Sequence, residues 1–192
     1  MGAILEYKRP NHAKLRKNMQ LIIRAAIRED IEAIQSIYSY YVLNGLASFE
    51  ITPPDETEML ARWRLVRDLG HPYLVAEIND TLAGFSYAST FRKRPAYDHT
   101  LENAVYVSPE YLEKGIGVCL LNKLIEECIH LGFRQMIAVI GDSNNHPSLS
   151  LHTKCGFERV GLLPSTGFKH GRWVDTVLMQ RSIGDGDKTL PS

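Results

Sequence analysis

Two different spacings of apolar residues alternate along this chain, and together they predict an α/β domain. Short apolar runs at residues 21–25 and 135–140 are typical of β-strands, and the second run is so continuous that both of its faces should be covered. A helical spacing follows Asp30 and continues to Gly45, with a shared face made by Ile31, Ile34, Ile37, Tyr38 and Tyr41.

The same criteria place further elements along the chain. Residues 54–69 predict a helix with acidic residues in its first turn, and 147–154 predict a short helix ended by Gly156. A hairpin is expected around Asn79 and Asp80, and the remaining strands are expected at 73–78, 82–91, 100–107, 158–163 and 174–179. The resulting order, β-α-α-β-β-β-α-β-α-β-β, predicts a mixed sheet with helices on both faces.

A glycine-bearing turn connects the strand 100–107 to the helix that follows it. Gly115 and Gly117 lie where that helix begins, and its apolar face is made by Leu120, Leu121, Leu124, Ile125 and Cys128. A diphosphate can bind such a turn, because the first N–H groups of a helix lack partners and lie at the positive end of its dipole. The alternative is a tight turn that the glycines merely permit. A P-loop ending and a dinucleotide fingerprint are both missing, which favours a different phosphate-bearing cofactor.

Composition limits the domain organisation and the partners. The 192 residues are 44% hydrophobic, enough for one core, so a single domain is expected over residues 21–183. Polar ends predict an N-terminal extension over 1–20 and a flexible tail over 184–192. The 22 basic and 22 acidic residues balance, which argues against nucleic acid or an anionic membrane as a partner.

The cysteines indicate the compartment. Cys119, Cys128 and Cys155 form no CxxC pair, and their apolar neighbours are typical of reduced structural thiols. No apolar run has the length of a membrane span, so a cytoplasmic protein is expected. His99 and His146 have no metal-ligand spacing, and no metal site is expected.

Several ordered blocks of residues are distinctive: FE at 49–50, FRKRPAY at 91–97, TLE at 100–102, VIGDSN at 139–144, LHTKCGF at 151–157 and FKHGRWVD at 168–175. With these blocks and the order of its elements, the chain resembles the GCN5-related N-acetyltransferase (GNAT) superfamily from about Leu21 to Arg181. The branch that contains phosphinothricin and methionine sulfoximine acetyltransferases is the most similar.

This resemblance implies the GNAT fold, with a mixed and mostly antiparallel central sheet, and acetyl-CoA bound at the glycine turn. Homodimers are the general state of the branch. One position departs from the family pattern: Leu112 stands where Arg or Gln is usual, which leaves the pyrophosphate to the backbone amides. The implied cofactor-binding residues are Val105, Tyr106, Val107, Glu113, Lys114, Gly115, Ile116, Gly117, Val118 and Asn145. For Asn145 the alternative is helix capping.

Acetyl transfer needs a base for the ammonium substrate and a proton for the departing thiolate. Glu102 is the candidate base, because it lies on the strand that enters the turn. The alternative is a strand carboxylate paired with Arg92 or Arg94, whose charges would lower its pKa. His152 is the second catalytic candidate, since most members of the superfamily have a proton-donating tyrosine at its position. A core histidine fixed by hydrogen bonds is the alternative.

Substrate choice is expected to depend on Phe49, Glu50, Arg92, Arg94 and Tyr97. A guanidinium binds an α-carboxylate through two parallel hydrogen bonds, and aromatic side chains can flank an amino-acid side chain. A solvated basic turn is the alternative for the arginines. Residues 169–173 are further candidates, and Phe168 and Trp173 are alternatively a subunit contact.

The sequence therefore predicts an acetyl-CoA-dependent N-acetyltransferase that acts on the α-amine of phosphinothricin, methionine sulfoximine or methionine sulfone. One rival is a polyamine or protein N-terminal acetyltransferase. Another is an acyl-CoA-binding regulatory domain without turnover.

Overall fold

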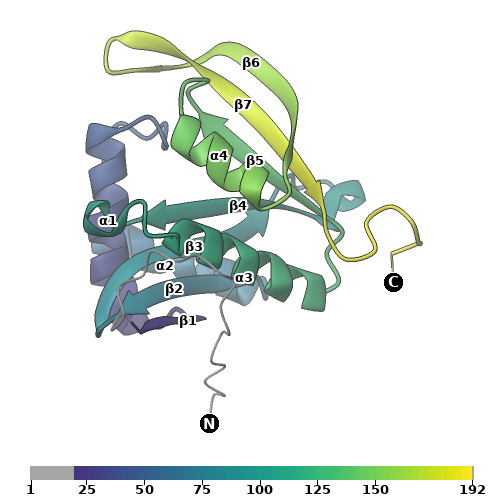
Figure 1. The fold of residues 1–192 in the computed structure, drawn as a ribbon, viewed down its shortest axis with the longest axis horizontal. Helices are drawn as coiled ribbons and strands as arrows, with labels where there is room; N and C mark the ends of the chain where they lie inside the picture. The colour runs from purple at the N-terminus through teal and green to yellow at the C-terminus, as the bar shows by residue number, and fades with distance from the viewer. Residues whose placement is uncertain (1–19, 192) are drawn as a thin grey trace.

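The computed structural model describes residues 20–191, which form one seven-stranded sheet in the order β1-β2-β3-β4-β5-β7-β6 (Figure 1). Every neighbouring pair is antiparallel except β4 and β5, which are parallel. The strands are β1 Leu21–Ala25, β2 Tyr73–Ile78, β3 Thr81–Thr90, β4 Thr100–Val107, β5 Gln135–Gly141, β6 Glu158–Lys169 and β7 Arg172–Ser182. The predicted mixed, mostly antiparallel sheet is confirmed.

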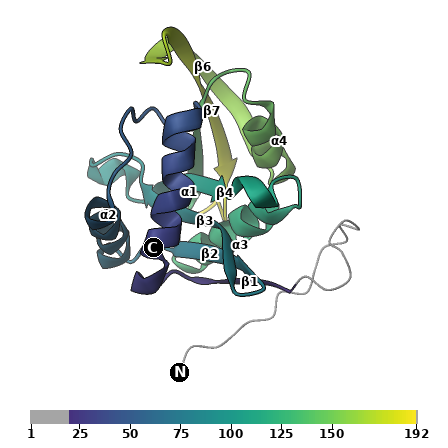
Figure 2. The ribbon, with the colours of Figure 1, turned by 90° about the vertical axis from the view of Figure 1, so that its left-hand side faces the viewer.

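Helices cover both faces of the sheet, as predicted. Helices α1 (Ile31–Asn44) and α2 (Glu56–Asp68) lie on one face, and α3 (Ile116–His130) and α4 (His146–Lys154) lie on the other (Figure 2). The Asp55 side chain accepts a hydrogen bond from the Glu58 N–H and so caps α2. Three short 3₁₀ turns, Arg28–Asp30, Pro95–Tyr97 and Pro109–Tyr111, complete the fold.

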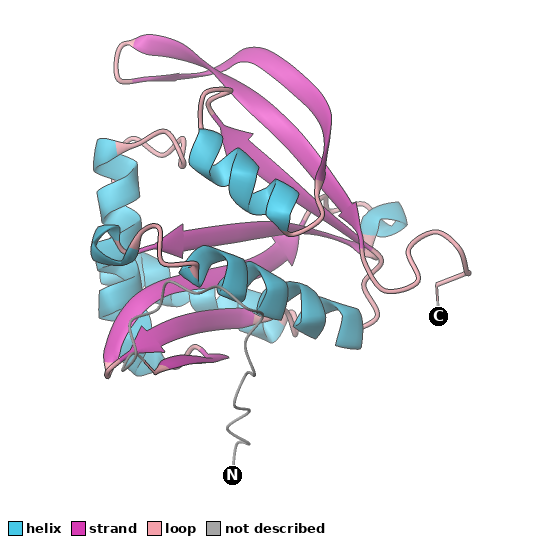
Figure 3. Cartoon of the chain, in the orientation of Figure 1, coloured by secondary structure: helices cyan, strands magenta, loops and turns pink. Residues whose placement is uncertain are grey.

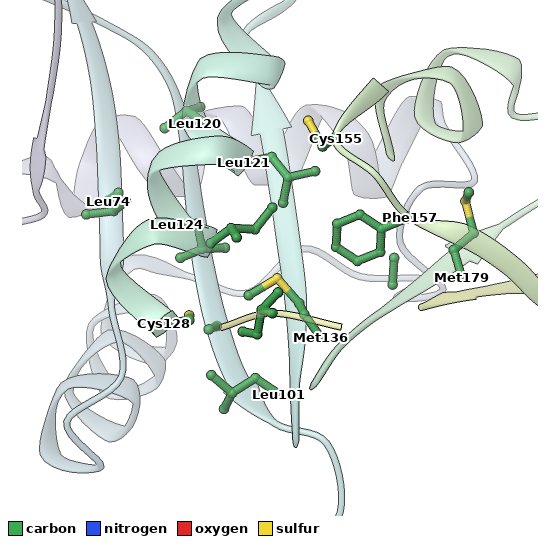
Figure 4. Close-up of a cluster of buried hydrophobic side chains, with 14 of the residues drawn as sticks. Leu74, Leu101, Leu120, Leu121, Leu124, Cys128, Met136, Cys155, Phe157 and Met179 are labelled. Atoms are coloured by element: carbon green, nitrogen blue, oxygen red, sulfur yellow. The ribbon is translucent and has the colours of Figure 1, made fainter. Parts of the chain in front are cut away.

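Two hydrophobic clusters hold these layers together. Leu120, Leu121 and Leu124 of α3 pack on one face of the sheet with Leu101, Met136 and Phe157 (Figure 4). The second cluster joins α1 and α2 to the opposite face through the side chains of Ile34, Val42, Met59, Trp63, Tyr73, Val75 and Phe85. Successive side chains of a strand point to opposite faces, so β2, β3 and β4 contribute to both clusters.

Strands β4 and β5 part after a short paired stretch. Their parallel register runs from Thr100 opposite Gln135 to Asn103 opposite Ala138. Beyond that point β4 continues to Val107, and β5 continues to Gly141, paired only with β7. The sheet therefore forks at Asn103.

The β6–β7 hairpin is longer than the sequence pattern predicted. It turns at His170 and Gly171, which both have positive φ, and it reaches well past the rest of the sheet (Figure 3). Most β6 side chains are exposed, so the apolar pattern that marks a buried strand is weak there.

The segment after β7 packs back onto the domain. The predicted extension over 1–20 lies almost wholly outside the described residues. The segment 184–190, predicted as a flexible tail, contains turns and contacts Arg134, which pairs with Asp185 and donates hydrogen bonds to Thr189 and Leu190. Among residues 20–191, no helix is long and apolar enough to cross a membrane.

Candidate active site

A cavity of about 690 Å³ lies where β4 ends, α3 begins and α4 begins. Tyr41 and Ala47 contribute from the side of α1. The remaining lining residues are Val105, Tyr106, Val107, Tyr111, Leu112, Glu113, Lys114, Gly115, Ile116, Gly117, Val118, Asn145, Pro147, Ser148, Ser150, Leu151 and Lys154. The ten residues predicted to bind the cofactor all lie in this set.

The glycine turn at the start of α3 has the geometry of an anion site. Gly115 is the N-cap residue in the left-handed conformation, with φ of 84°, and no side chain caps the helix. The first N–H groups of α3 are therefore free of a side-chain partner at the wall of the cavity. By contrast, Asp55 caps α2 and Asn145 caps α4. An anion in the cavity would supply the missing cap.

The backbone also approaches the cavity closely at Gly117. A Cβ atom built there would lie 3.4 Å from Cδ2 of Leu151 and 3.6 Å from Cγ2 of Val107. A larger side chain at this position would therefore fill space at the wall of the cavity. Leu112, at the position that departs from the family pattern, also lines the cavity and is 48% exposed.

Asn145 caps α4, which is one of the two alternatives raised from the sequence, and its contact with the cofactor stays a prediction. Its Oδ1 accepts a hydrogen bond from the Ser148 N–H at 3.3 Å, and its Nδ2 donates to the Gly141 carbonyl oxygen. The residue is thus the N-cap of α4, and it also lines the cavity.

Glu102 is half-buried on β4 and does not line the cavity itself. By strand alternation its side chain is on the same face as Tyr106, the face covered by α1 and α2. Burial raises the pKa of the Glu102 carboxyl, and the positive charge of Arg92 offsets part of the rise. Among the described residues Glu102 has no ion pair, so the expected lowering by a charge partner is wrong in its net sign.

His152 lies in the core on the opposite side of the sheet, with 5% of its surface exposed. Its Nε2 lies 3.0 Å from Oδ1 of Asn103, and its Nδ1 lies 2.8 Å from the Ser148 carbonyl oxygen. Burial lowers the pKa of the imidazole, and the Ser148 hydrogen bond opposes this. The ring does not line the cavity, so the geometry favours the core histidine over the direct proton donor.

Phe49 and Glu50 lie apart from the cavity, in the connection between α1 and α2. The Phe49 ring packs against Gly167 of β6 and Gly141 of β5, where an added Cβ would come within 2.4 Å and 2.7 Å of ring carbons. Glu50 accepts hydrogen bonds from Arg62 and from the Tyr38 hydroxyl. The Lys169 ammonium is buried below this connection and donates to the Ser48 carbonyl oxygen at 2.7 Å.

Arg92, Arg94 and Tyr97 lie together on the exposed connection from β3 to β4. The Arg92 guanidinium stacks 5.2 Å from the Phe91 ring centroid, and Arg92 is the arginine whose charge reaches Glu102. Neither arginine has an ion pair within residues 20–191. The predicted substrate residues thus fall into two groups, one in the connection between α1 and α2 and one in the connection from β3 to β4.

Sequence reasoning gave Tyr38 on a helix face and Tyr106 among the cofactor-binding residues, but it did not predict that tyrosines gather on the α1 and α2 face. Tyr73 and Tyr87 stack with ring centroids 5.0 Å apart, and Tyr106 packs edge-on against Tyr38 at 5.1 Å. Burial raises the pKa of the Tyr87 hydroxyl, and Glu102 and Glu50 add to the rise. Strand alternation could have placed Tyr87 and Tyr106 on the face of Glu102, but their packing on α1 depends on contacts distant in sequence.

Asn103 and Arg62 were also missed. The Asn103 side chain forms hydrogen bonds with Ile137 of the neighbouring strand β5 and with His152 of α4. Arg62, on α2, pairs with Glu50. Neither belongs to a motif with a distinctive local spacing. The part of the chain that the structure describes has no cluster of His, Cys, Asp or Glu fit for a metal ion.

The chain is similar in sequence to known proteins. Residues 32–157 match the model of the Acetyltransferase (GNAT) family. The chain is 51% identical over 169 residues to the phosphinothricin N-acetyltransferase of Alcaligenes faecalis, covering 88% of this chain and 86% of that protein. It is 34% identical to the L-methionine sulfoximine/L-methionine sulfone acetyltransferase of Salmonella typhimurium, covering 86% of this chain and 96% of that protein.

A solved structure extends the similarity to the fold. The crystal structure of a GNAT superfamily phosphinothricin acetyltransferase from Sinorhizobium meliloti in complex with acetyl-CoA superposes with a TM-score of 0.87. The two chains are 47% identical, and the match covers 90% of this chain and 93% of the other.

Proposed function

The chain belongs to the GNAT family of acetyltransferases and uses acetyl-CoA for N-acetylation, and on that premise we propose that it acetylates the α-amine of small amino-acid analogues. Phosphinothricin, methionine sulfoximine and methionine sulfone are the proposed substrates, and two similar proteins carry these compounds in their names. The observation that carries the proposal is an Arg92 guanidinium that has no ion pair within residues 20–191 and whose positive charge acts on the partly buried carboxyl of Glu102.

The cavity residues fit the cofactor. The uncapped first turn of α3 offers the N–H groups of Ile116, Gly117 and Val118 to a pyrophosphate, and the glycines leave room for it. Asn145 and the end of β4 line the remaining wall, where peptide-like groups can be bound. When bound, acetyl-CoA supplies a thioester whose carbonyl carbon accepts the amine.

We assign the general base to Glu102. An α-amine is protonated near neutral pH, and it must lose a proton before it can attack. Because burial raises the pKa of Glu102, its carboxylate is a stronger base than one in water. The carboxylate accepts the proton from the ammonium, directly or through a water.

Arg92 provides recognition of an acid. Its guanidinium has donors arranged to bind a carboxylate through two hydrogen bonds, and no carboxylate of residues 20–191 forms an ion pair with it. A substrate with a carboxylate at Arg92 and an amine at Glu102 is an amino acid, which agrees with the proposed α-amino-acid analogues. Arg94 and Tyr97 lie on the same connection and complete the proposed substrate set with Phe49 and Glu50.

The proposal is tested by the release of coenzyme A from acetyl-CoA with a panel of amines. We expect turnover with phosphinothricin, methionine sulfoximine and methionine sulfone, and little with spermidine or with a peptide that begins with alanine. Turnover confined to spermidine or the peptide would overturn the substrate assignment. Tight acetyl-CoA binding without any turnover would instead indicate a regulatory domain.

We also propose that the protein is a cytoplasmic homodimer. The three cysteines are free, as expected in a reducing compartment. The β6–β7 hairpin exposes Val160, Leu162, Leu163, Phe168 and Trp173, with Trp173 64% exposed. An apolar surface of this kind is typical of a subunit contact. Sedimentation equilibrium should give the mass of two chains, and Trp173→Glu should shift it toward one.

A further inference from the structure

We infer that Asn103 is a positioning residue for acetyl transfer, because its amide bridges β4 to β5 and to α4 at the point where the sheet forks. This inference rests on the proposed function. It concerns a residue that does not contact the cavity, and it assigns to His152 a role through Asn103.

The bridge consists of two hydrogen bonds from one buried amide. Nδ2 of Asn103 donates to the Ile137 carbonyl oxygen at 2.9 Å, and Oδ1 lies 3.0 Å from Nε2 of His152. Because the amide nitrogen is already committed to Ile137, the oxygen is the atom that faces the imidazole. Nε2 of His152 is therefore the donor in that contact. With 7% of its surface exposed, Asn103 has little access to water as a replacement partner.

The bridge continues from His152 to the wall of the cavity. With Nε2 as the donor, Nδ1 of the neutral ring is an acceptor, and the Ser148 hydroxyl, whose Oγ lies 3.4 Å away, donates to it. The Ser148 N–H donates to Oδ1 of Asn145. Nδ2 of Asn145 in turn donates to the carbonyl oxygen of Gly141, at the end of β5. Ser148 and Asn145 both line the cavity, so a continuous series of hydrogen bonds links Asn103 to the cofactor wall.

Its position makes Asn103 the last link between the parallel strands. The β4–β5 register ends at the Asn103–Ala138 pair, and the next three β5 residues pair only with β7. The preceding residue on β4 is Glu102, the proposed base. A change in the separation of β4 and β5 at Asn103 would therefore move Glu102 relative to the cavity, and small displacements of a base are costly in rate.

This arrangement also explains why His152 is buried. The Nε2 proton is donated to Asn103, and Nδ1 of the neutral ring accepts from Ser148, so neither nitrogen has a proton to donate elsewhere. His152 joins α4 to the fork instead. A direct role of His152 in proton transfer and a positioning role through Asn103 predict different rates when Asn103 and His152 are both replaced.

The test is a double-mutant cycle with Asn103→Leu, His152→Phe and the combined variant. We expect Asn103→Leu to lower kcat by at least about tenfold and to leave the KM for phosphinothricin nearly unchanged. Calorimetry should show a weaker affinity for acetyl-CoA, since the residues of α4 that line the cavity lose their hydrogen-bonded connection to Asn103. His152→Phe should cost little more in the Asn103→Leu background, because both residues act through one bridge.

Two results would overturn the inference. One is a folded Asn103→Leu protein with the wild-type kcat and acetyl-CoA affinity. The other is an equal loss of kcat from His152→Phe in both backgrounds, which would mean that His152 acts directly. If Asn103→Leu alone does not fold, the combined variant serves, since an apolar pair replaces both polar partners. A wild-type kcat in that variant contradicts the inference.

Ser86→Ala is the matched control. Ser86 is fully buried in the neighbouring strand β3, and its hydroxyl has no hydrogen-bond partner among residues 20–191, so its loss should leave kcat and affinity unchanged. Failure of the proposed function is distinguishable from failure of this inference. A wild-type protein without transferase activity rejects the former, whereas the acetyl-CoA affinities still report on the bridge.

Discussion

Glu102 and Asn103 are consecutive on β4 and point to opposite faces of the sheet. One face carries the carboxyl with its raised pKa, and the other carries the amide that fastens β4 to β5 and α4. The proposed chemistry and its support are therefore adjacent in sequence and separated in space. Variants of Glu102 and Arg92 test the proposed chemistry.

Glu102→Gln should remove the base and preserve the shape of the side chain. We expect kcat to fall by about 10²-fold or more, with the acetyl-CoA affinity unchanged in calorimetry. Glu126→Gln is the control, since Glu126 is exposed on α3 and should be dispensable. A wild-type rate for Glu102→Gln across the pH range would exclude this carboxyl as the base.

The pH dependence follows from the groups around Glu102, which are Arg92 and Tyr87. The carboxyl must be deprotonated to act, so kcat/KM should fall as the pH drops through the raised pKa of Glu102. Arg92 lowers that pKa, and Arg92→Met should move the acid limb of the profile to higher pH. A profile that stays in place or moves to lower pH would show that Arg92 does not act on the titrating group.

Arg92→Lys separates charge from geometry. The positive charge is kept, so the acid limb should stay nearly in place, while the loss of the planar fork should raise the KM for methionine sulfone. The carboxamide of methionine sulfone should be affected much less. Equal losses for both compounds in Arg92→Lys and in Arg94→Lys would require the carboxylate assignment to be withdrawn.

Gly115→Ala should weaken acetyl-CoA binding beyond its cost in stability. Gly132→Ala is the matched control, because both glycines have φ near 85° and open space around a new Cβ. Each variant should lose about 1 kcal/mol of folding stability through backbone strain. Only the Gly115 variant should lose affinity for acetyl-CoA, and equal affinities in the two variants would place the cofactor elsewhere.

Gly167→Ala tests whether the position of the Phe49 ring matters for substrate binding. An added Cβ would come within 2.4 Å of the Phe49 ring, so the ring must move. Because Phe49 is a proposed substrate-binding residue, the substrate site changes with it. We expect a raised KM for phosphinothricin. Gly161→Ala, on the same strand, places its Cβ 3.6 Å from Leu178 and should leave the KM unchanged.

Much of the fold could be predicted from local pattern. The strands 21–25, 73–78 and 100–107 were located to the residue, because turn residues such as Asn79 and Asp80 mark their ends. The β6–β7 hairpin was underestimated because an exposed edge strand needs no apolar alternation. The glycine turn could be predicted because everything that defines it lies within a few residues.

The supporting contacts could not be predicted in the same way. His152 and Asn103 are 49 residues apart in sequence, and Lys169 reaches Ser48 across 121 residues. Neither contact leaves a periodic signal, since each depends on how the strands are ordered in the sheet. Burial, rather than any motif, also sets the direction of the pKa shift at Glu102.

The most direct test of the central claim is the identity of the product formed from acetyl-CoA and phosphinothricin. Mass spectrometry and NMR should show one acetyl group on the α-nitrogen, formed in equal amount with free coenzyme A. The Glu102→Gln protein should form the same product about 10²-fold more slowly. Coenzyme A released with free acetate, or no acetylated amine with acetyl-CoA bound, would contradict the account.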